Sequence, residues 1–346
     1  MKISKWAALV SAMLCVCMLA TPLLSCSKTG KVVIEMAGAD SFNTWLATYA
    51  IRQGIVTSPD VDLRITLADT RTYETALMAG NYDMGTLSNA RLASAQSSNA
   101  NLVSISTFVI HAGALERKGV NFVLTRANSP ITSRSDLKGK TVAVGNISSS
   151  STSSLVAMLK ILDNIEAKEQ EKITDAANQV TLVQAQGDLA ELVKRGTYDV
   201  ALIGQNDGPR ATKDPALKVL MNIDQLFYDM YKMPYITSTL VVNRDFQKKN
   251  PTAVSAAYEL LKESHAYGEE HIDELAHLYA EEYGKGTDAD FYKMIYNEHS
   301  GVSLGEIDGN AKEVIMAGFE FAVIAGESSS LPDPDVIFGT PYLREE

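Results

Sequence analysis

The residues best suited to binding a small ligand lie in the polar stretch 145–154, which reads GNISSSSTSS. It follows a buried strand predicted at Thr141–Val144 and precedes a helix predicted to begin near Leu155. The start of a helix leaves backbone N–H groups unpaired at the positive end of the helix dipole, and serine hydroxyls add further donors. We therefore expect this loop to bind a small anionic or polar group. The alternative is a serine run that only caps the helix, because serine is a preferred capping residue anywhere.

Motifs for covalent, metal or nucleotide chemistry are absent from the sequence. His271 and His277 are six residues apart, which places them about 120° apart around a helix, whereas His-Glu-x-x-His has both histidines on one face. Asp273, His277 and Glu281 share a face, which we interpret as an acidic, solvated surface. There is no Gly-x-Ser-x-Gly elbow, Walker loop or dinucleotide fingerprint. We therefore expect no catalytic residue, no metal and no cofactor.

The elements that must position the serine loop alternate between strand and helix. In the first part of the chain, four strands are predicted at Lys31–Ala37, Val61–Ala68, Tyr82–Thr86 and Leu102–Ile110. Between them, helices are predicted at Trp45–Gln53, Thr72–Ala79 and Asn89–Ser97. The second of these strands alternates apolar and polar residues, as an edge strand does. Repeated strand–helix units predict an α/β protein with a mostly parallel, doubly wound sheet.

A second strand–helix series begins after the strand predicted at Asn121–Thr125. Its strands are predicted at 141–144, 179–184, 199–203 and 217–221, and its helices at 154–163 and 188–195. The apolar strand Ile236–Asn243 then leads into a tail that looks almost entirely helical from Pro251 onward. Two such series, separated by long crossing strands, predict two lobes with two hinge strands and a ligand site between them.

The N-terminus has the pattern of a targeting signal. Two lysines precede the apolar run Trp6–Ala20, and Leu23 and Ser25 stand at positions −3 and −1 relative to Cys26, as in bacterial lipoprotein signals. We expect residues 1–25 to be removed, Cys26 to be acylated, and the protein to be extracytoplasmic and lipid-anchored to a bacterial membrane. A transmembrane anchor is the alternative, because Trp6–Leu24 approaches the length that spans a bilayer.

Composition and charge limit the partners that the protein can have. The chain has 346 residues, of which 46% are apolar and 21% charged, a globular balance with room for two lobes. Removal of residues 1–25 takes away two lysines and no acid, so the net charge of −11 becomes −13. Nucleic acid and anionic lipid need clustered Lys and Arg, so neither is expected as a partner. Cys15 and Cys17 lie in the leader, and the mature chain therefore has no disulfide framework.

Five short stretches carry a family resemblance, and they are Thr75–Gly85, Asn128–Ile131, Asp136–Val144, Leu192–Ala201 and Val241–Phe246 followed by Pro251. In order and spacing they resemble bacterial extracytoplasmic solute-binding proteins of the nitrate/sulfonate/taurine and thiamine-pyrimidine class. Together they span about residues 31 to 285. The resemblance implies the periplasmic-binding-protein-like type II fold, with lobe 1 at residues 26–122 and 239–346 and lobe 2 at 123–238.

The resemblance also implies a lipid-tethered receptor that closes two lobes on a small solute and delivers it to an ABC permease and its ATPase. Polar groups at the loop ends of both predicted sheets must then converge on the solute. Lobe 1 offers Ser41, Phe42, Asn43, Trp45, Thr86, Ser88, Asn89 and His111. Lobe 2 offers Asn146, Ser148, Ser149, Ser150, Ser151, Gln205, Asn206 and Asp207. Core packing of Trp45, a structural role of His111 and a simple turn at 205–209 are the alternatives.

The sequence leaves the chemical class of the ligand open. Anion receptors of this family often add Arg or Lys to helix N-terminal amides. Arg71, Arg91 and Arg210 lie near loop ends here, but outside any recognisable motif. The candidates are a sulfonate, carboxylate or nitrate-like anion and a pyrimidine-like heterocycle stacked on Trp45, Phe42 or Tyr235. An enzyme of a pyrimidine or menaquinone precursor pathway, and a ligand sensor for a membrane kinase, are the other classes that this fold allows.

Overall fold

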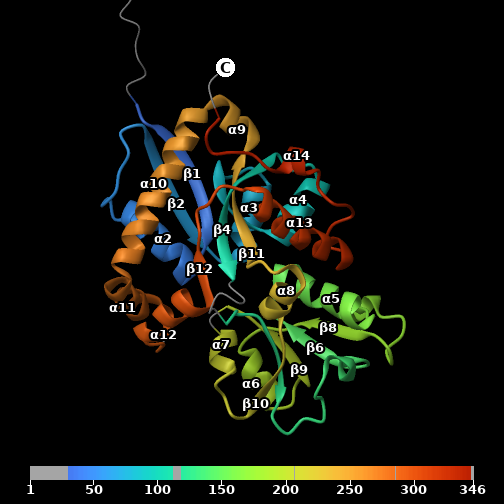
Figure 1. Cartoon of the computed structure of the whole chain (residues 1–346). Coiled ribbons are helices and arrows are strands. Elements are labelled where there is room, and N and C mark those ends of the chain that lie inside the picture. The colour runs from blue at the N-terminus through green and yellow to red at the C-terminus, as the bar shows by residue number, and fades with distance from the viewer. Residues whose placement is uncertain (1–29, 112–117, 206, 285, 344–346) are drawn as a thin grey trace, which may run out of the picture.

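A computed structural model describes residues 30–111, 118–205, 207–284 and 286–343 of the chain (Figure 1). Residues 1–25, Cys26 and Asn206, for which we made predictions, lie outside these ranges. The described strands form two six-stranded sheets with helices packed around them. The predicted α/β class with two sheets is thereby confirmed. Within the described ranges, none of the helices has the length and apolar character needed to cross a membrane.

The first sheet contains β1 (Val32–Ala39), β2 (Val61–Ala68), β3 (Met84–Ser88), β4 (Leu102–His111), β11 (Tyr235–Asn243) and β12 (Ser300–Val302). In the order β12-β4-β11-β3-β1-β2, β1 pairs in parallel with β2 and β3, whereas β11 is antiparallel to β3 and β4. The strand β2 lies at the edge, as its alternating residues predict. Helices α2 (Phe42–Arg52), α3 (Thr70–Met78) and α4 (Asn89–Ser97) connect β1 to β4.

The second sheet contains β5 (Phe122–Arg126), β6 (Thr141–Val144), β7 (Ala167–Glu169), β8 (Val180–Gln184), β9 (Val200–Ile203) and β10 (Leu217–Asn222). In the order β10-β5-β9-β6-β8-β7, β6 is parallel to β8 and β9, and β5 is antiparallel to β9 and β10. Its helices are α5 (Ser150–Asp163), α6 (Leu189–Lys194), α7 (Asp207–Ala211) and α8 (Ile223–Tyr231).

The chain crosses between the sheets twice, between β4 and β5 and between α8 and β11. The first crossing leads into β5 and the second into β11, and the predicted lobe boundaries fall within these two strands. The lobe boundaries, 26–122 with 239–346 and 123–238, stay a prediction.

The C-terminal part is mostly helical, as predicted, and returns to the first sheet. It contains α9 (Arg244–Lys249), α10 (Pro251–Glu270), α11 (Ile272–Tyr283), α12 (Ala289–Met294), a π-helical turn (Ile295–His299), α13 (Gly309–Ile324) and α14 (Pro334–Ile337). The sequence analysis missed β7 and β12 because strands of three residues are too short to show a period. It also missed α8, although Asn222 caps that helix by accepting a hydrogen bond from the Gln225 N–H.

The helix after the serine loop begins earlier than predicted. We expected a polar loop through Ser154, but α5 starts at Ser150. Ser149 is the N-cap, and its hydroxyl accepts a hydrogen bond from the Thr152 N–H at 3.2 Å. The Ser154 hydroxyl donates to the Ser150 carbonyl at 2.7 Å, so a serine can sit inside the helix with its hydroxyl satisfied. Most of the serine run therefore forms the first turn of α5 rather than a free loop.

Apolar packing holds α5 in place between the two sheets. The helix α13 packs against both α4 and α5, and α10 packs against α2 (Figure 1). One buried cluster joins Ala90 of α4, Phe319 and Phe321 of α13, and Leu155 and Leu159 of α5. The Ser154 hydroxyl also lies 2.8 Å from the Tyr235 hydroxyl of β11, and both groups are buried. The start of α5 is thus positioned by side chains that are far apart in the sequence.

We expect Leu155→Ala to destabilise the fold, because Leu155 has no exposed surface and its truncation leaves a cavity in this cluster. The expected loss is about 2–5 kcal/mol in the free energy of unfolding, measured by urea titration. Ile161→Ala is the matched control, since Ile161 lies on the same helix with 48% of its surface exposed and should change stability by less than about 0.5 kcal/mol. Equal losses in the two variants would contradict the packing role of Leu155.

Candidate ligand-binding site

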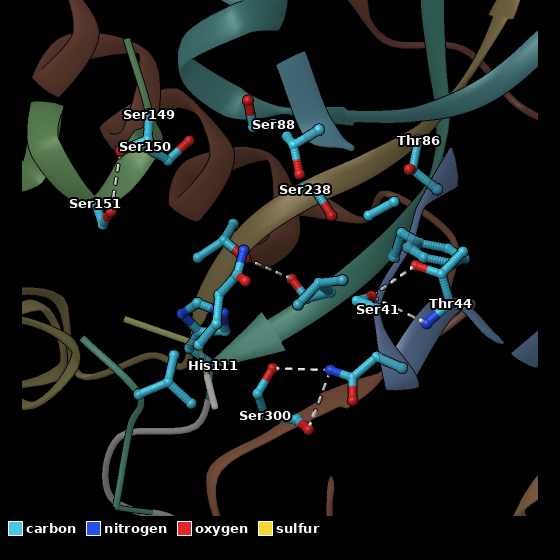
Figure 2. A pocket seen from close by; sticks show the side chains of 18 of the residues that line it. Ser41, Thr44, Thr86, Ser88, His111, Ser149, Ser150, Ser151, Ser238 and Ser300 are labelled. Atoms are coloured by element: carbon cyan, nitrogen blue, oxygen red, sulfur yellow. Dashed lines mark hydrogen bonds between the residues drawn. The ribbon is translucent and has the colours of Figure 1, made fainter. Parts of the chain in front are cut away.

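A cavity of about 210 Å³ is lined by residues that belong to both sheets and their loops (Figure 2). From the first sheet come the loop after β1 and the ends of β3 and β4. From the second sheet come the loop after β6 and Gln205 after β9. Figure 2 shows hydroxyl groups of Ser41, Thr86, Ser88, Ser149, Ser238 and Ser300 arranged around this space. The cavity therefore lies where polar groups from the two series meet, as predicted from the sequence.

Three helices begin at the cavity wall. Ser41 caps α2, Ser88 precedes α4 and Ser149 caps α5, and all three serines line the cavity. The Ser41 hydroxyl accepts a hydrogen bond from the Thr44 N–H at 3.4 Å. The positive ends of these helix dipoles consequently face the same space, an arrangement that favours a negatively charged ligand.

Hydrogen bonds among the lining residues hold their side chains in place. The Asn43 side-chain amide donates to the Ser300 hydroxyl at 3.1 Å and to the Ser300 carbonyl at 3.3 Å. The hydroxyls of Ser149 and Ser151 are 3.0 Å apart. The Ala90 N–H of α4 donates to the Ser150 hydroxyl of α5 at 3.2 Å, which joins the two sides of the cavity directly.

Carboxylates are present in the wall of the cavity, but no Lys or Arg is found among the described residues that line it. Glu74 is 2% exposed, and its carboxylate accepts the Ser88 N–H at 3.1 Å and lies 3.5 Å from the Arg91 guanidinium. Burial raises the pKa of Glu74, against the opposing effects of Ser88 and Arg91. Asp40 is an exposed second carboxylate of the wall. Of the arginines considered above, Arg210 is bound elsewhere, to Asp207 at 3.4 Å and to Thr287 at 2.7 Å.

His111 is the one histidine found in the wall within the described ranges. Its Nδ1 lies 3.2 Å from the carboxylate of Asp224 and 3.0 Å from the side-chain amide of Asn121. Asp224 is fully buried, and it also accepts the backbone N–H groups of Val120 and Asn121 at 2.7 and 2.9 Å. Burial by itself would raise the pKa of Asp224, but the charge and hydrogen bond of His111 and the backbone donors lower it below its usual value.

Most of the predicted site residues line this cavity, and they are Ser41, Phe42, Asn43, Thr86, Ser88, His111, Asn146, Ser149, Ser150, Ser151 and Gln205. Four others do not line it. Trp45 is packed in the core against Tyr279, and Asn89 is buried and donates to the Ile236 carbonyl at 2.6 Å. Ser148 and Asp207 also lie outside the lining. Ligand contact by any of the predicted residues, whether or not it lines this cavity, stays a prediction, and so does contact by Asn206.

Sequence reasoning missed several lining residues, and these include Asp40, Thr44, Thr70, Tyr73, Glu74, Phe108, Asn121, Thr237, Ser238 and Ser300. Thr70 could have been found, because Asp69 precedes it as an N-cap that accepts the Thr72 N–H at 3.1 Å. Ser300 has no local signal, since it reaches the cavity only through the pairing of β12 with β4. Within the described part of the chain, no group of three or more His, Cys, Asp or Glu is placed to hold a metal ion.

Comparison with known proteins identifies relatives of the chain. The model of a protein family described as the periplasmic phosphonate substrate-binding protein of ABC transporters matches residues 55–291. No curated protein shows significant similarity in sequence.

Three solved structures illustrate the similarity of the fold. The periplasmic aliphatic sulphonate binding protein SsuA of Escherichia coli has a TM-score of 0.68 at 16% identity, over 92% of this chain and 95% of its own. The alkanesulfonate-binding protein SsuA of Xanthomonas axonopodis pv. citri, bound to MOPS, has a TM-score of 0.63 at 15% sequence identity, over 89% of this chain and 97% of its own. An ABC transporter protein of Parabacteroides distasonis has a TM-score of 0.60 at 15% sequence identity, over 89% of this chain and 99% of its own.

We expect Ser149→Ala to lower stability, because the variant loses the side-chain acceptor for the Thr152 N–H at the start of α5. The expected loss is about 1 kcal/mol in the free energy of unfolding. Ser148→Ala is the control, since Ser148 precedes the cap and lies outside the cavity lining. Thermal or urea unfolding of both variants measures the difference. An unchanged stability of Ser149→Ala would show that another group caps the helix.

Proposed function

This chain belongs to the phosphonate family of periplasmic substrate-binding proteins of ABC transporters, and we propose that it captures a small oxyanion, such as a sulfonate or phosphonate, between its two lobes. Membership of this family implies an extracytoplasmic protein whose partners are a small molecule and the permease and ATPase of an importer.

Three helix N-termini converge on one cavity, and this convergence is the reason that we propose an anion as the ligand. The caps Ser41 and Ser149, and Ser88 at the start of α4, bring partial positive charge and hydroxyl donors from both sides of the space. An oxyanion with several oxygens can accept from all three at once. The ligand would then bridge α2 and α4 on one side and α5 on the other, which stabilises the closed arrangement of the lobes.

A stacked heterocycle receives less support from the same cavity. Trp45 is packed in the core, and Tyr235 is buried against Phe227 with ring centroids 4.2 Å apart. Phe42 lines the cavity, but its ring packs against Tyr279 and Tyr292 at 5.2 and 5.3 Å. Of the three aromatic platforms considered from the sequence, only Phe42 therefore borders the ligand space.

A transport role rather than catalysis is part of the proposal. The family that matches the chain consists of substrate-binding components of transporters, and the sulfonate-binding neighbours share its fold. The side chains around the cavity are mainly hydroxyls and amides held by neighbouring groups, which suits binding and release of an unchanged solute.

We expect ethanesulfonate, methylphosphonate or both to raise the melting temperature of the full-length protein in detergent, in buffers free of sulfonate and phosphate. Binding at a hundredfold excess over the dissociation constant adds about 2.7 kcal/mol, which corresponds to a shift of a few degrees. Mass spectrometry of molecules released from freshly purified protein by denaturation should identify an oxyanion. Release of an aromatic heterocycle, with no shift by either anion, would contradict the proposal.

We expect Ser151→Ala to weaken binding of whichever of these anions binds, by roughly ten- to a hundredfold, because a hydroxyl that bonds a charged ligand contributes about 1.5–3 kcal/mol. Isothermal titration calorimetry measures the change. Ser148→Ala is again the matched control, as a neighbouring serine outside the lining. Equal affinities of Ser151→Ala and wild type would remove Ser151 from the site.

We propose in addition that Cys26 carries a lipid anchor, on the support of the leucine at −3, the small residue at −1 and the apolar leader. Cys26→Ala should abolish incorporation of radiolabelled palmitate in a bacterial host. Cys15→Ala and Cys17→Ala should retain it, because both residues lie in the segment that is removed. Labelling of the Cys26→Ala protein would overturn the anchor.

A further inference from the structure

The buried carboxylate of Asp224 lies beside the Nδ1 atom of His111. Asp224 is the second residue of α8, and no part of it is exposed. Two backbone N–H groups, the Asn121 amide at 3.1 Å and the His111 Nδ1 at 3.2 Å surround its oxygens. A fully buried charge needs such compensation, and the His111 ring supplies part of it.

The same ring nitrogen of His111 has both a donor and an acceptor beside it. The Asn121 amide can donate to Nδ1 when the imidazole is neutral, and Asp224 can accept a proton from Nδ1 when the ring is charged. A neutral ring can also carry its hydrogen on Nδ1 and donate it to Asp224, which leaves Nε2 as an acceptor. Only the charged ring both donates to Asp224 from Nδ1 and keeps an N–H on Nε2.

The ring of His111 belongs to the cavity wall, and 12% of its side chain is exposed (Figure 2). No described residue makes a hydrogen bond to Nε2. Because neither Lys nor Arg lines the described cavity, His111 is the one side chain there that can bring a positive charge to a ligand. A charged donor forms a hydrogen bond to an oxyanion that is roughly twice as strong as that of a neutral donor.

From this geometry we propose that His111 is the cationic contact of the bound anion and that Asp224 is the positioning residue that orients and charges it. This inference rests on the proposed binding of an oxyanion. An anion in the cavity and Asp224 beside the ring both favour the imidazolium over the neutral ring. By linkage, an anion that contacts the imidazolium binds more tightly at lower pH.

Other titratable groups surround this cluster. Tyr235 of β11 pairs with His111, and burial raises the pKa of its phenol, which keeps it neutral. His299 lies next to β12 and bonds the Gly119 carbonyl at 2.6 Å, and burial lowers the pKa of His299. The exposed pair Lys118 and Glu298 lies at 3.0 Å. Asp40 and Glu74 belong to the same cavity wall. Of these groups, His299 is the one whose titration overlaps the same pH range.

The test is isothermal titration calorimetry of the full-length protein in mild detergent with ethanesulfonate, which remains a monoanion from pH 5.5 to 8.0. Bis-Tris and Tris buffers avoid competing sulfonates. Affinity of the wild type should fall about tenfold over this range, as expected for loss of one charge-assisted contact. His111→Gln should bind weakly at pH 5.5 and show no dependence on pH. Asp224→Asn should likewise make the affinity for ethanesulfonate depend less on pH than in the wild type.

His299→Gln is the matched control and should keep the slope of the wild type, since its ring bonds the backbone rather than the cavity. If Asp224→Asn fails to fold, His111→Gln alone decides the question. A wild-type affinity independent of pH, or a His111→Gln variant that keeps the slope, would overturn this inference and leave the proposed function standing. If neither ethanesulfonate nor methylphosphonate binds at any pH, the proposed anion function itself fails, and this inference fails with it.

Discussion

A carboxylate shielded from water can stay ionised in a protein only when donors surround it, and Asp224 meets this condition at the junction of the two crossings. It accepts hydrogen bonds from Val120 and Asn121, which precede β5, while its own helix α8 leads to β11. The two segments that pass between the sheets are thus joined through one buried charge. His111 therefore belongs both to the cluster that joins the two crossings and to the wall of the cavity.

Apolar packing supports the opposite side of the cavity. The helix α13 comes from the C-terminal part of the chain and covers both α4 and α5, so that the starts of these helices keep a constant relation to one another. The hydrogen bond from the Ala90 N–H to the Ser150 hydroxyl lies at this contact. A helix start that donates hydrogen bonds to a ligand must be held in place. The effect of the helix dipole decreases within the first turn and depends on the direction in which the helix points.

The wall of the cavity carries few formal charges among its described residues. Helix N-termini and hydroxyls carry only partial charge, and Glu74 is balanced by Arg91 at 3.5 Å. The proposed anion would bind such a wall without the strong, fixed attraction of several guanidinium groups, which suits a receptor that must release its solute. The proposed contact with His111 would depend on the protonation state of the ring.

Local sequence determined most of the elements and part of the site. Periodicity predicted the described strands other than β7 and β12 to within about two residues. Helix starts after strands pointed to Ser41, Ser88 and Ser149, because capping depends on residues adjacent in the chain. The tertiary structure alone decided that Trp45 faces the core, that Ser300 reaches the cavity through β12, and that Asp224 meets His111 from 113 positions away. These contacts depend on how sheets pair and helices pack across the fold, which a local pattern does not encode.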